Sequence, residues 1–362
     1  MVAVFSAFVV TVLFMFVLRP VAIAVGLVDT PGGRKRHGVA VPVIGGIAMS
    51  IGLGLGTSLV SNPASWSPML LGVYLLAVVG TIDDRFDLPA NVRLIAQGCA
   101  ALLVVFASGV VVLELGEFFG YQLSLGALSV PFTILFVLTL VNAFNITDGI
   151  DGLGGGLALL SLLVIGAISL GTPLFPLVTV AASVVAGYLL FNLPLGVNGA
   201  VRSFMGDAGS TTLGLIIATM GIYLTQGEVQ VVAPAVGLWL VAVPVFELFT
   251  TIVRRLLSNR SPFAPDHEHL HHVLAENGLS RRATLVVILG LAALCAAVGI
   301  LGHTLSVSDS VMVVLWLLAG TAYYQLLRYP RSMVAAALWI QRPGGVEFRR
   351  DLRAVRSSTS DT

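Results

Sequence analysis

The chain has 362 residues, of which 57% are hydrophobic and 10% are charged, and its formal net charge is +1. Because about a quarter of the residues in a soluble globular protein are charged, this composition excludes a soluble globular protein, a disordered chain, a secreted disulfide scaffold and a soluble nucleic-acid-binding protein. The mean hydropathy of +0.99 indicates a polytopic membrane protein. The two cysteines, Cys99 and Cys295, fall within apolar segments. We expect both to be small core residues without a metal or disulfide partner.

A membrane-spanning helix needs about 20 predominantly apolar residues, and turn signals divide the longer apolar runs of this chain into such segments. Ser61-Asn62-Pro63 separates the second segment from the third, and Gly171-Thr172-Pro173 separates the sixth from the seventh. The segments do not alternate in polarity as barrel strands would. The sequence therefore predicts an all-α bundle of about eleven transmembrane helices. The expected spans are 2–18, 43–60, 67–82, 94–113, 128–145, 153–170, 174–191, 210–224, 229–253, 283–303 and 310–327.

The 19 lysine and arginine residues all fall on one side of these spans. Cytoplasmic loops carry the positive excess, so we expect the N-terminus outside and the C-terminus in the cytoplasm. The first segment lacks a basic start and a cleavage site, which favours a retained span over a signal peptide. We expect residues 1–327 to form a single transmembrane domain and residues 328–362 to form a cytoplasmic Arg-rich tail at the anionic inner leaflet.

The acidic residues fall into two groups. Those expected on the outer side are read as solvated loop charges: Glu114, Glu117, Glu228 and Asp309. The others of interest lie at cytoplasmic helix ends: Asp83, Asp84, Asp148, Asp151 and Asp207. Each of these could cap a helix or pair with an arginine, but ionisable groups at the membrane edge are functional candidates by default. Together with an asparagine and glycines that let backbone N–H groups approach an anion, they predict a divalent cation, Mg²⁺ or Mn²⁺, that holds a phosphorylated substrate.

Two further cytoplasmic segments are rich in basic residues or histidine. The longest inner loop contains His267, His269, His271 and His272. A zinc site is one interpretation and surface histidines are another, but the oxygen-rich surroundings favour contacts with phosphate oxygens or a nucleotide. The second segment contains Arg36 and His37 and precedes Gly45-Gly46. It is either a topology signal or part of an anion site at a helix start.

Four sequence blocks, taken in order and spacing, resemble a known family. They are Arg34-Lys35-Arg36-His37 with Pro42 and Gly45-Gly46; Asp83-Asp84; Asn142-Ala143-Phe144-Asn145 through Asp148, Asp151 and Gly152; and Phe204-Met205-Gly206-Asp207-Ala208-Gly209-Ser210. Over all the expected spans, the chain resembles the polyprenyl-phosphate N-acetylhexosamine-1-phosphate transferases. A fifth block, His269-Leu270-His271-His272, resembles the His-x-His-His form of the branch that transfers N-acetylglucosamine 1-phosphate to undecaprenyl phosphate.

The resemblance implies an enzyme of the bacterial inner membrane with a helical catalytic domain and a site that faces the cytoplasm. Its substrates would be UDP-N-acetylglucosamine and undecaprenyl phosphate, and its products undecaprenyl-diphosphate-N-acetylglucosamine and UMP. The cofactor would be Mg²⁺ or Mn²⁺, and no nucleic acid would be involved. The sequence leaves open whether the chain forms a homodimer.

The resemblance also implies roles for single residues. Asn145 and Asp207 would bind the metal ion, Asp83 would act on the lipid phosphate, and Asp84 would support Asp83. The expected substrate-binding residues are Phe204, which would stack on uracil, Asp151 near the nucleoside, His269, His271 and His272 at the nucleotide or diphosphate, and Arg36 and His37.

We expect the lipid phosphate oxygen to attack the sugar-bearing phosphorus directly. A phosphate monoester has a second pKa of about 6, so it is largely dianionic and mainly needs its charge neutralised near a second polyanion. The alternative is a covalent route with Asp83 or Asp148 as the nucleophile.

Alternative functions are the same reaction with another N-acetylhexosamine or the muropeptide, a transporter, and a scaffold. A transporter would place its polar residues near the midplane of the membrane.

Overall fold

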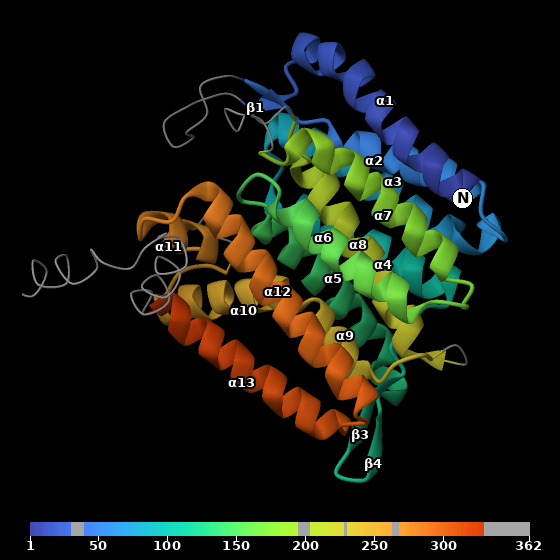
Figure 1. Cartoon of the computed structure of the whole chain (residues 1–362), viewed down its shortest axis with the longest axis vertical. Coiled ribbons are helices and arrows are strands. Elements are labelled where there is room, and N and C mark those ends of the chain that lie inside the picture. The colour runs from blue at the N-terminus through green and yellow to red at the C-terminus, as the bar shows by residue number, and fades with distance from the viewer. Residues whose placement is uncertain (30–39, 195–202, 228–229, 263–267, 329–362) are drawn as a thin grey trace, which may run out of the picture.

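The computed structural model describes residues 1–29, 40–194, 203–227, 230–262 and 268–328. In this part of the chain the fold is predominantly helical, and long helices pack side by side into one bundle (Figure 1). The helices are α1 (Val2–Val25), α2 (Gly45–Ser58), α3 (Ser67–Phe86), α4 (Ala90–Ser108), α5 (Ser129–Thr147), α6 (Leu153–Ile168), α7 (Phe175–Asn192), α8 (Gly206–Thr225), α9 (Pro234–Leu240), α10 (Ala242–Leu257), α11 (Leu270–Glu276), α12 (Arg281–Thr304) and α13 (Asp309–Arg328). Arg36, His37, His267 and the tail from residue 329 lie outside the described residues.

The helix lengths establish a polytopic membrane protein. Among the described residues, eight helices are long and apolar enough to cross a membrane, and α9 with α10, which meet at a bend of 78°, would add a ninth span. Each expected span coincides with a helix or, for 229–253, with this bent pair. However, α2 has 14 residues and α6 has 16, so both are shorter than the spanning helices. The count of eleven and the orientation therefore stay predictions.

The prediction of an all-α chain is wrong in two places, where short antiparallel sheets form. In one, β1 (Val28–Asp29) pairs with β2 (Val41–Pro42); in the other, β3 (Glu114–Phe118) pairs with β4 (Tyr121–Ser124) and forms the hairpin at the bottom of Figure 1. Phe119 and Gly120, with φ of 52° and 86°, form the turn of this hairpin. Positive φ at both turn positions matches the twist of the flanking strands. Strands this short carry too few residues for an alternating pattern to be seen in the sequence.

Two expectations about side-chain burial are also wrong. Asp309, expected to be a solvated loop charge, is only 8% exposed, and it accepts hydrogen bonds from the N–H of Glu117 at 3.0 Å and of Ala235 at 3.3 Å. These bonds offset the cost of burying the carboxylate, and they join α13 to the hairpin and to α9. Cys295 is buried as expected, but Cys99 is exposed on α4. Because the surrounding lipid is also apolar, no hydrophobic free energy is gained when a small side chain faces the protein instead of the lipid.

The central element is α8, most of whose residues are buried. Small residues let its neighbours come close, as is typical of membrane helices. A Cβ added at Gly46 of α2 would overlap the backbone of Gly209, and one added at Gly80 of α3 would overlap the backbone of Ala208. The first turn of α8 is thus held against α2 and α3, and this first turn carries Asp207.

Candidate active site

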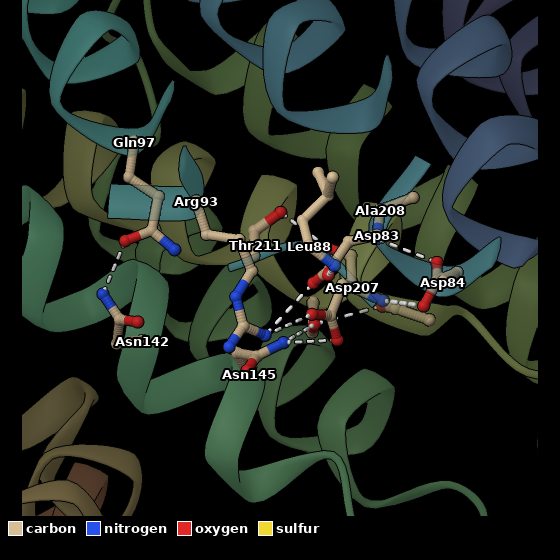
Figure 2. Close-up of polar contacts among 12 residues, drawn as sticks. Asp83, Asp84, Leu88, Arg93, Gln97, Asn142, Asn145, Asp207, Ala208 and Thr211 are labelled. Carbon is tan, nitrogen blue, oxygen red and sulfur yellow. Dashed lines mark hydrogen bonds and ion pairs between the residues drawn. The ribbon is translucent and has the colours of Figure 1, made fainter. Parts of the chain in front are cut away.

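Four of the predicted site residues, Asp83, Asp84, Asn145 and Asp207, gather where the end of α3, the end of α5 and the start of α8 meet (Figure 2). Asp83 and Asp84 lie in the last turn of α3, Asn145 in the last turn of α5 and Asp207 in the first turn of α8. Because α3 and α5 end where α8 begins, three segments far apart in the sequence deliver polar side chains to one place.

Asp84 caps the start of α8 from the neighbouring helix. Its Oδ1 accepts the N–H of Asp207 at 2.9 Å, and its Oδ2 lies 3.4 Å from the N–H of Ala208. A carboxylate is stabilised there because the first N–H groups of a helix have no partner within the helix and the helix dipole is positive at this end. Gly206 has a φ of 65°, and a Cβ on it would overlap the Asp84 carboxylate. Both observations explain a glycine directly before Asp207.

Arg93 of α4 joins Asp83 to Asp207. Its Nη1 lies 3.1 Å from Oδ2 of Asp83 and 3.4 Å from Oδ2 of Asp207. Asp83 is 7% exposed and also accepts the N–H of Leu88 at 2.7 Å through Oδ1. Both Asp83 oxygens thus have donors, and one guanidinium partly neutralises two acids. In the sequence, Arg93 served only to predict the orientation of the chain. Its position in the first turn of α4, the helix that follows the Asp83-Asp84 pair, also indicates that it lies near these acids.

Asn145 and Asp207 have the geometry of neighbouring ligands to a small cation. Asn145 donates from Nδ2 to Oδ1 of Asp207 at 2.8 Å and to Oγ of Ser210 at 3.0 Å. Neighbouring oxygens around octahedral Mg²⁺ lie about 2.9 Å apart, and a 180° rotation of the Asn145 amide would exchange its nitrogen for its oxygen. The described residues contain no group of three or more His, Cys, Asp or Glu side chains that could hold a metal ion. The pair therefore fits a cation completed by water and phosphate oxygens, as is usual for Mg²⁺.

Asp148 and Asp151 lie in the short connection between α5 and α6. The pKa of Asp148 is raised to about 7, mainly by burial and then by the charges of Asp84 and Asp151, while the N–H of Gly154 opposes the rise. Asp151 lies 3.9 Å from Nη1 of Arg281 at the start of α12. Asp148 therefore changes its charge near neutral pH, which is a property of groups that take part in proton transfer or substrate binding.

The histidine segment, His269 to His272, packs against the connection between α5 and α6. His269 and His271 are buried, and a Cβ on Gly149 would overlap the His271 ring. The ring centroids of His269 and His271 lie 5.7 Å apart in a stacked arrangement, and those of His271 and His272 lie 4.2 Å apart. Burial, and then the charges of His272 and His269, lower the pKa of His271 to about 3. At neutral pH His271 is therefore an uncharged hydrogen-bonding group and not a cation.

Phe204 is held beside the start of α2. Its N–H donates to the carbonyl of Pro42 at 3.0 Å, and its own carbonyl accepts the N–H of Gly45 at 2.9 Å. This backbone pairing joins the Pro42-to-Gly46 block to the block of Asp207, so two of the predicted blocks are adjacent. The half-buried Phe204 precedes Asp207 by three residues, and its expected contact with uracil stays a prediction.

Two other polar residues near the site were missed from the sequence. Gln97 of α4 accepts the Nδ2 of Asn142 at 2.7 Å and so fixes the first asparagine of the Asn142-to-Asn145 block. Glu247 of α10 is 2% exposed and lies 2.8 Å from Nδ1 of His269. Both are polar residues within helices that the sequence predicts to span the membrane, and ionisable or polar residues there are functional candidates by default.

Comparison with known proteins assigns the family. The model of glycosyl transferase family 4 matches residues 66–225, a range that contains the Asp83, Asn145 and Asp207 blocks. A protein of Yersinia pestis named undecaprenyl-phosphate alpha-N-acetylglucosaminyl 1-phosphate transferase is 35% identical over 316 residues, which are 86% of each chain. Proteins with the same name from Escherichia coli O157:H7, 35% identical over 88% of each chain, and Haemophilus influenzae, 32% identical over 92% of this chain and 97% of the relative, also match.

These matches extend over nearly the whole chain, and three of the sequence blocks that carry the resemblance, those of Asp84, Asn145 and Asp207, meet in space. The resemblance predicted from the sequence is confirmed. The chain belongs to glycosyl transferase family 4, the polyprenyl-phosphate N-acetylhexosamine-1-phosphate transferases.

Proposed function

We propose that this protein transfers N-acetylglucosamine 1-phosphate from UDP-N-acetylglucosamine to undecaprenyl phosphate and releases UMP. The observation that carries the proposal is the meeting of Asp83, Arg93, Asn145 and Asp207 within hydrogen-bond distance at the ends of four helices. The names of relatives that match over most of the chain support both substrates. The same site would serve another N-acetylhexosamine, which is the alternative to be tested.

In the reaction, an oxygen of the lipid phosphate forms a bond to the phosphorus that carries the sugar. The bond from that phosphorus to the bridging oxygen breaks, and UMP leaves with the electron pair. The attacking phosphate has a second pKa of about 6, so the main obstacle is repulsion between two polyanions. The guanidinium of Arg93, whose side chain is 38% exposed between Asp83 and Asp207, would supply positive charge that screens this repulsion.

We propose that Asn145 and Asp207 hold Mg²⁺ or Mn²⁺. When bound, the cation would neutralise the diphosphate and the leaving UMP. The donor set supports this assignment because a 180° rotation of the Asn145 amide would place its oxygen where Nδ2 now lies, 2.8 Å from Oδ1 of Asp207, which is close to octahedral spacing. Asp84 orients the peptide N–H of Asp207 and thereby fixes where the Asp207 carboxylate points.

We expect direct transfer and no phosphosugar-enzyme intermediate. Asp83 is 7% exposed, and its two oxygens already accept from Leu88 and Arg93, so it is poorly suited to be a nucleophile. We propose that it acts on the lipid phosphate through Arg93, whose guanidinium it holds in place. Asp84 is occupied by the first N–H groups of α8. Incubation with labelled UDP-sugar in the absence of lipid should leave the protein unlabelled, and recovery of a labelled protein would contradict direct transfer.

We also propose that the site faces the cytoplasm of a bacterial inner membrane, because described basic residues lie at the helix ends, among them Arg85 in the last turn of α3 and Arg93 in the first turn of α4, beside the site. This position lets a water-soluble nucleotide sugar meet a phosphate at the membrane surface. Transport is less well supported. The α9–α10 bend resembles the broken helices of transporters, but the residues at the bend, Leu240, Val241 and Ala242, are apolar.

The test is UMP release by detergent-purified protein supplied with undecaprenyl phosphate, Mg²⁺ and, in turn, UDP-N-acetylglucosamine, UDP-N-acetylgalactosamine or UDP-N-acetylmuramoyl-pentapeptide. We expect the first to give the highest kcat/KM. A preference for either of the others would replace the sugar assignment. No UMP with any of the three would contradict the proposed function.

A further inference from the structure

Glu247 lies in α10 and is 2% exposed, although α9 and α10 together are long and apolar enough to form a membrane span. A carboxylate in such surroundings is costly unless donors surround it. Here they do: Oε1 lies 2.8 Å from Nδ1 of His269 and accepts the N–H of Leu270 at 3.2 Å, and Oε2 accepts the hydroxyl of Tyr323. One carboxylate thus joins α10, the start of α11 and α13.

Contacts of His269 connect this hydrogen-bond network to the candidate site. The His269 ring stacks on the His271 ring, and His271 packs against Gly149, next to Asp148. His271 is 3% exposed, and its Nε2 has no hydrogen-bond partner among the described residues. A buried polar atom without a partner calls for an explanation, and the simplest one is that a bound substrate supplies the partner. The contacts therefore run from Tyr323, through Glu247 and His269, to Nε2 of His271, which has no hydrogen-bond partner among the described residues.

We propose that Glu247 and Tyr323 are positioning residues that fix the segment from His269 to His272 beside the connection between α5 and α6, and so set the affinity for the nucleotide sugar. The proposal rests on the proposed function for the identity of that substrate. Neither residue needs to touch the reacting phosphates. Glu247 binds Nδ1 of His269, which fixes the orientation of this ring. Tyr323 in turn holds the second oxygen of Glu247.

The geometry distinguishes the two residues. Glu247 binds the histidine segment directly, whereas Tyr323 is one hydrogen bond further away. A Glu247→Gln substitution keeps the size of the side chain but replaces one acceptor oxygen by an NH₂ donor. A Tyr323→Phe substitution removes one hydroxyl and keeps the ring packed against Phe246, whose centroid lies 5.8 Å away. The neighbouring Tyr324 is half-buried on the same helix, and Tyr324→Phe is the matched control.

The experiment measures UMP release against UDP-N-acetylglucosamine concentration, at saturating undecaprenyl phosphate, for wild type, E247Q, Y323F, the double variant and Y324F. We expect KM to rise about tenfold in E247Q, as for the loss of a hydrogen bond to a charged group, and several-fold in Y323F, while kcat changes by less than about threefold. The double variant should resemble E247Q, because Tyr323 acts through Glu247. Y324F should match wild type.

Hydrogen exchange of the peptide 268–277 in the same detergent provides a measurement that does not depend on turnover. The N–H of Leu270 donates to Glu247, so exchange in this peptide should be faster in E247Q and Y323F than in wild type and Y324F. If wild type releases no UMP, the proposed function fails and hydrogen exchange alone tests the positioning role. Unchanged exchange in both variants, unchanged KM in both variants of an active enzyme, or an equal effect of Y324F would overturn the proposal.

Discussion

Replacing Arg93 by alanine is the perturbation that tests the site geometry most sharply. Arg93 places one nitrogen 3.1 Å from Asp83 and 3.4 Å from Asp207, and its side chain is 38% exposed. Because solvent screens an ion pair with this exposure, the free energy of unfolding should fall by only about 1 kcal/mol. The catalytic effect should be larger, because a hydrogen bond from a charged group contributes about 1.5–3 kcal/mol. At about 1.4 kcal/mol per factor of ten, kcat/KM should fall about tenfold to 150-fold.

The same substitution has a second consequence of opposite sign. Without the guanidinium, the positive charge beside Asp83 and Asp207 is lost. A divalent cation should then bind more tightly, because the group it neutralises is more negative. We therefore expect the Mg²⁺ concentration for half-maximal UMP release to fall in Arg93→Ala while kcat also falls.

The assay is UMP release at varied UDP-N-acetylglucosamine and varied Mg²⁺, with thermal unfolding in the same detergent. Arg93→Lys is the matched control, since it keeps the charge but loses the planar fork, and its kcat/KM should lie between those of wild type and Arg93→Ala. A kcat/KM in Arg93→Ala within about twofold of wild type would refute the reasoning. So would a rise in the Mg²⁺ requirement, because that would make Arg93 an aid to cation binding.

Three other substitutions test separate parts of the site. Asp207→Asn should abolish UMP release while the protein stays folded in the membrane fraction, and near-normal turnover with Mg²⁺ would exclude Asp207 as a metal ligand. Asp148 has a folded-state pKa of about 7, raised above the ordinary value of 3.8, so its contribution to stability is fully present below about pH 4 and is lost as the pH rises through 7; the unfolding midpoint should therefore decrease less between pH 5 and pH 8 in Asp148→Asn than in wild type, and an identical decrease would contradict the assignment. Gly149→Ala should raise KM for the UDP-sugar at least about tenfold, because its Cβ would overlap the His271 ring and a small misplacement of binding groups is costly; a KM equal to that of wild type would show that the histidine segment does not set affinity.

The helical architecture could be predicted because the membrane requires long apolar helices. Each expected span coincides with a helix or with the bent pair α9 and α10. The predictions that were wrong concerned single side chains, such as Asp309 and Cys99, and the short strands. Nothing in the sequence distinguishes a solvated Asp309 from one that accepts two backbone N–H groups, since that depends on where the β3–β4 hairpin folds.

The candidate site was predictable where residues form a spaced block. Asp83, Asn145 and Asp207 stand in such blocks, and they meet as neighbours. Arg93 and Glu247 stand outside these blocks, and each also binds a residue far away in the sequence, Asp207 for Arg93 and Tyr323 for Glu247. The sequence alone does not show these distant pairs. The sequence also could not show that Asp84 caps α8 while Asp83 binds Arg93, because this depends on which carboxylate points at the first turn of α8.

The most direct test of the central claim is the stoichiometry of one incubation. Purified protein with Mg²⁺, UDP-N-acetylglucosamine and undecaprenyl phosphate should yield UMP and undecaprenyl-diphosphate-N-acetylglucosamine in equal amounts, both measured by mass spectrometry, and omission of the lipid should abolish both products. Release of UMP without lipid, or a lipid product that carries the sugar through a single phosphate, would contradict direct transfer of a phosphosugar by this site.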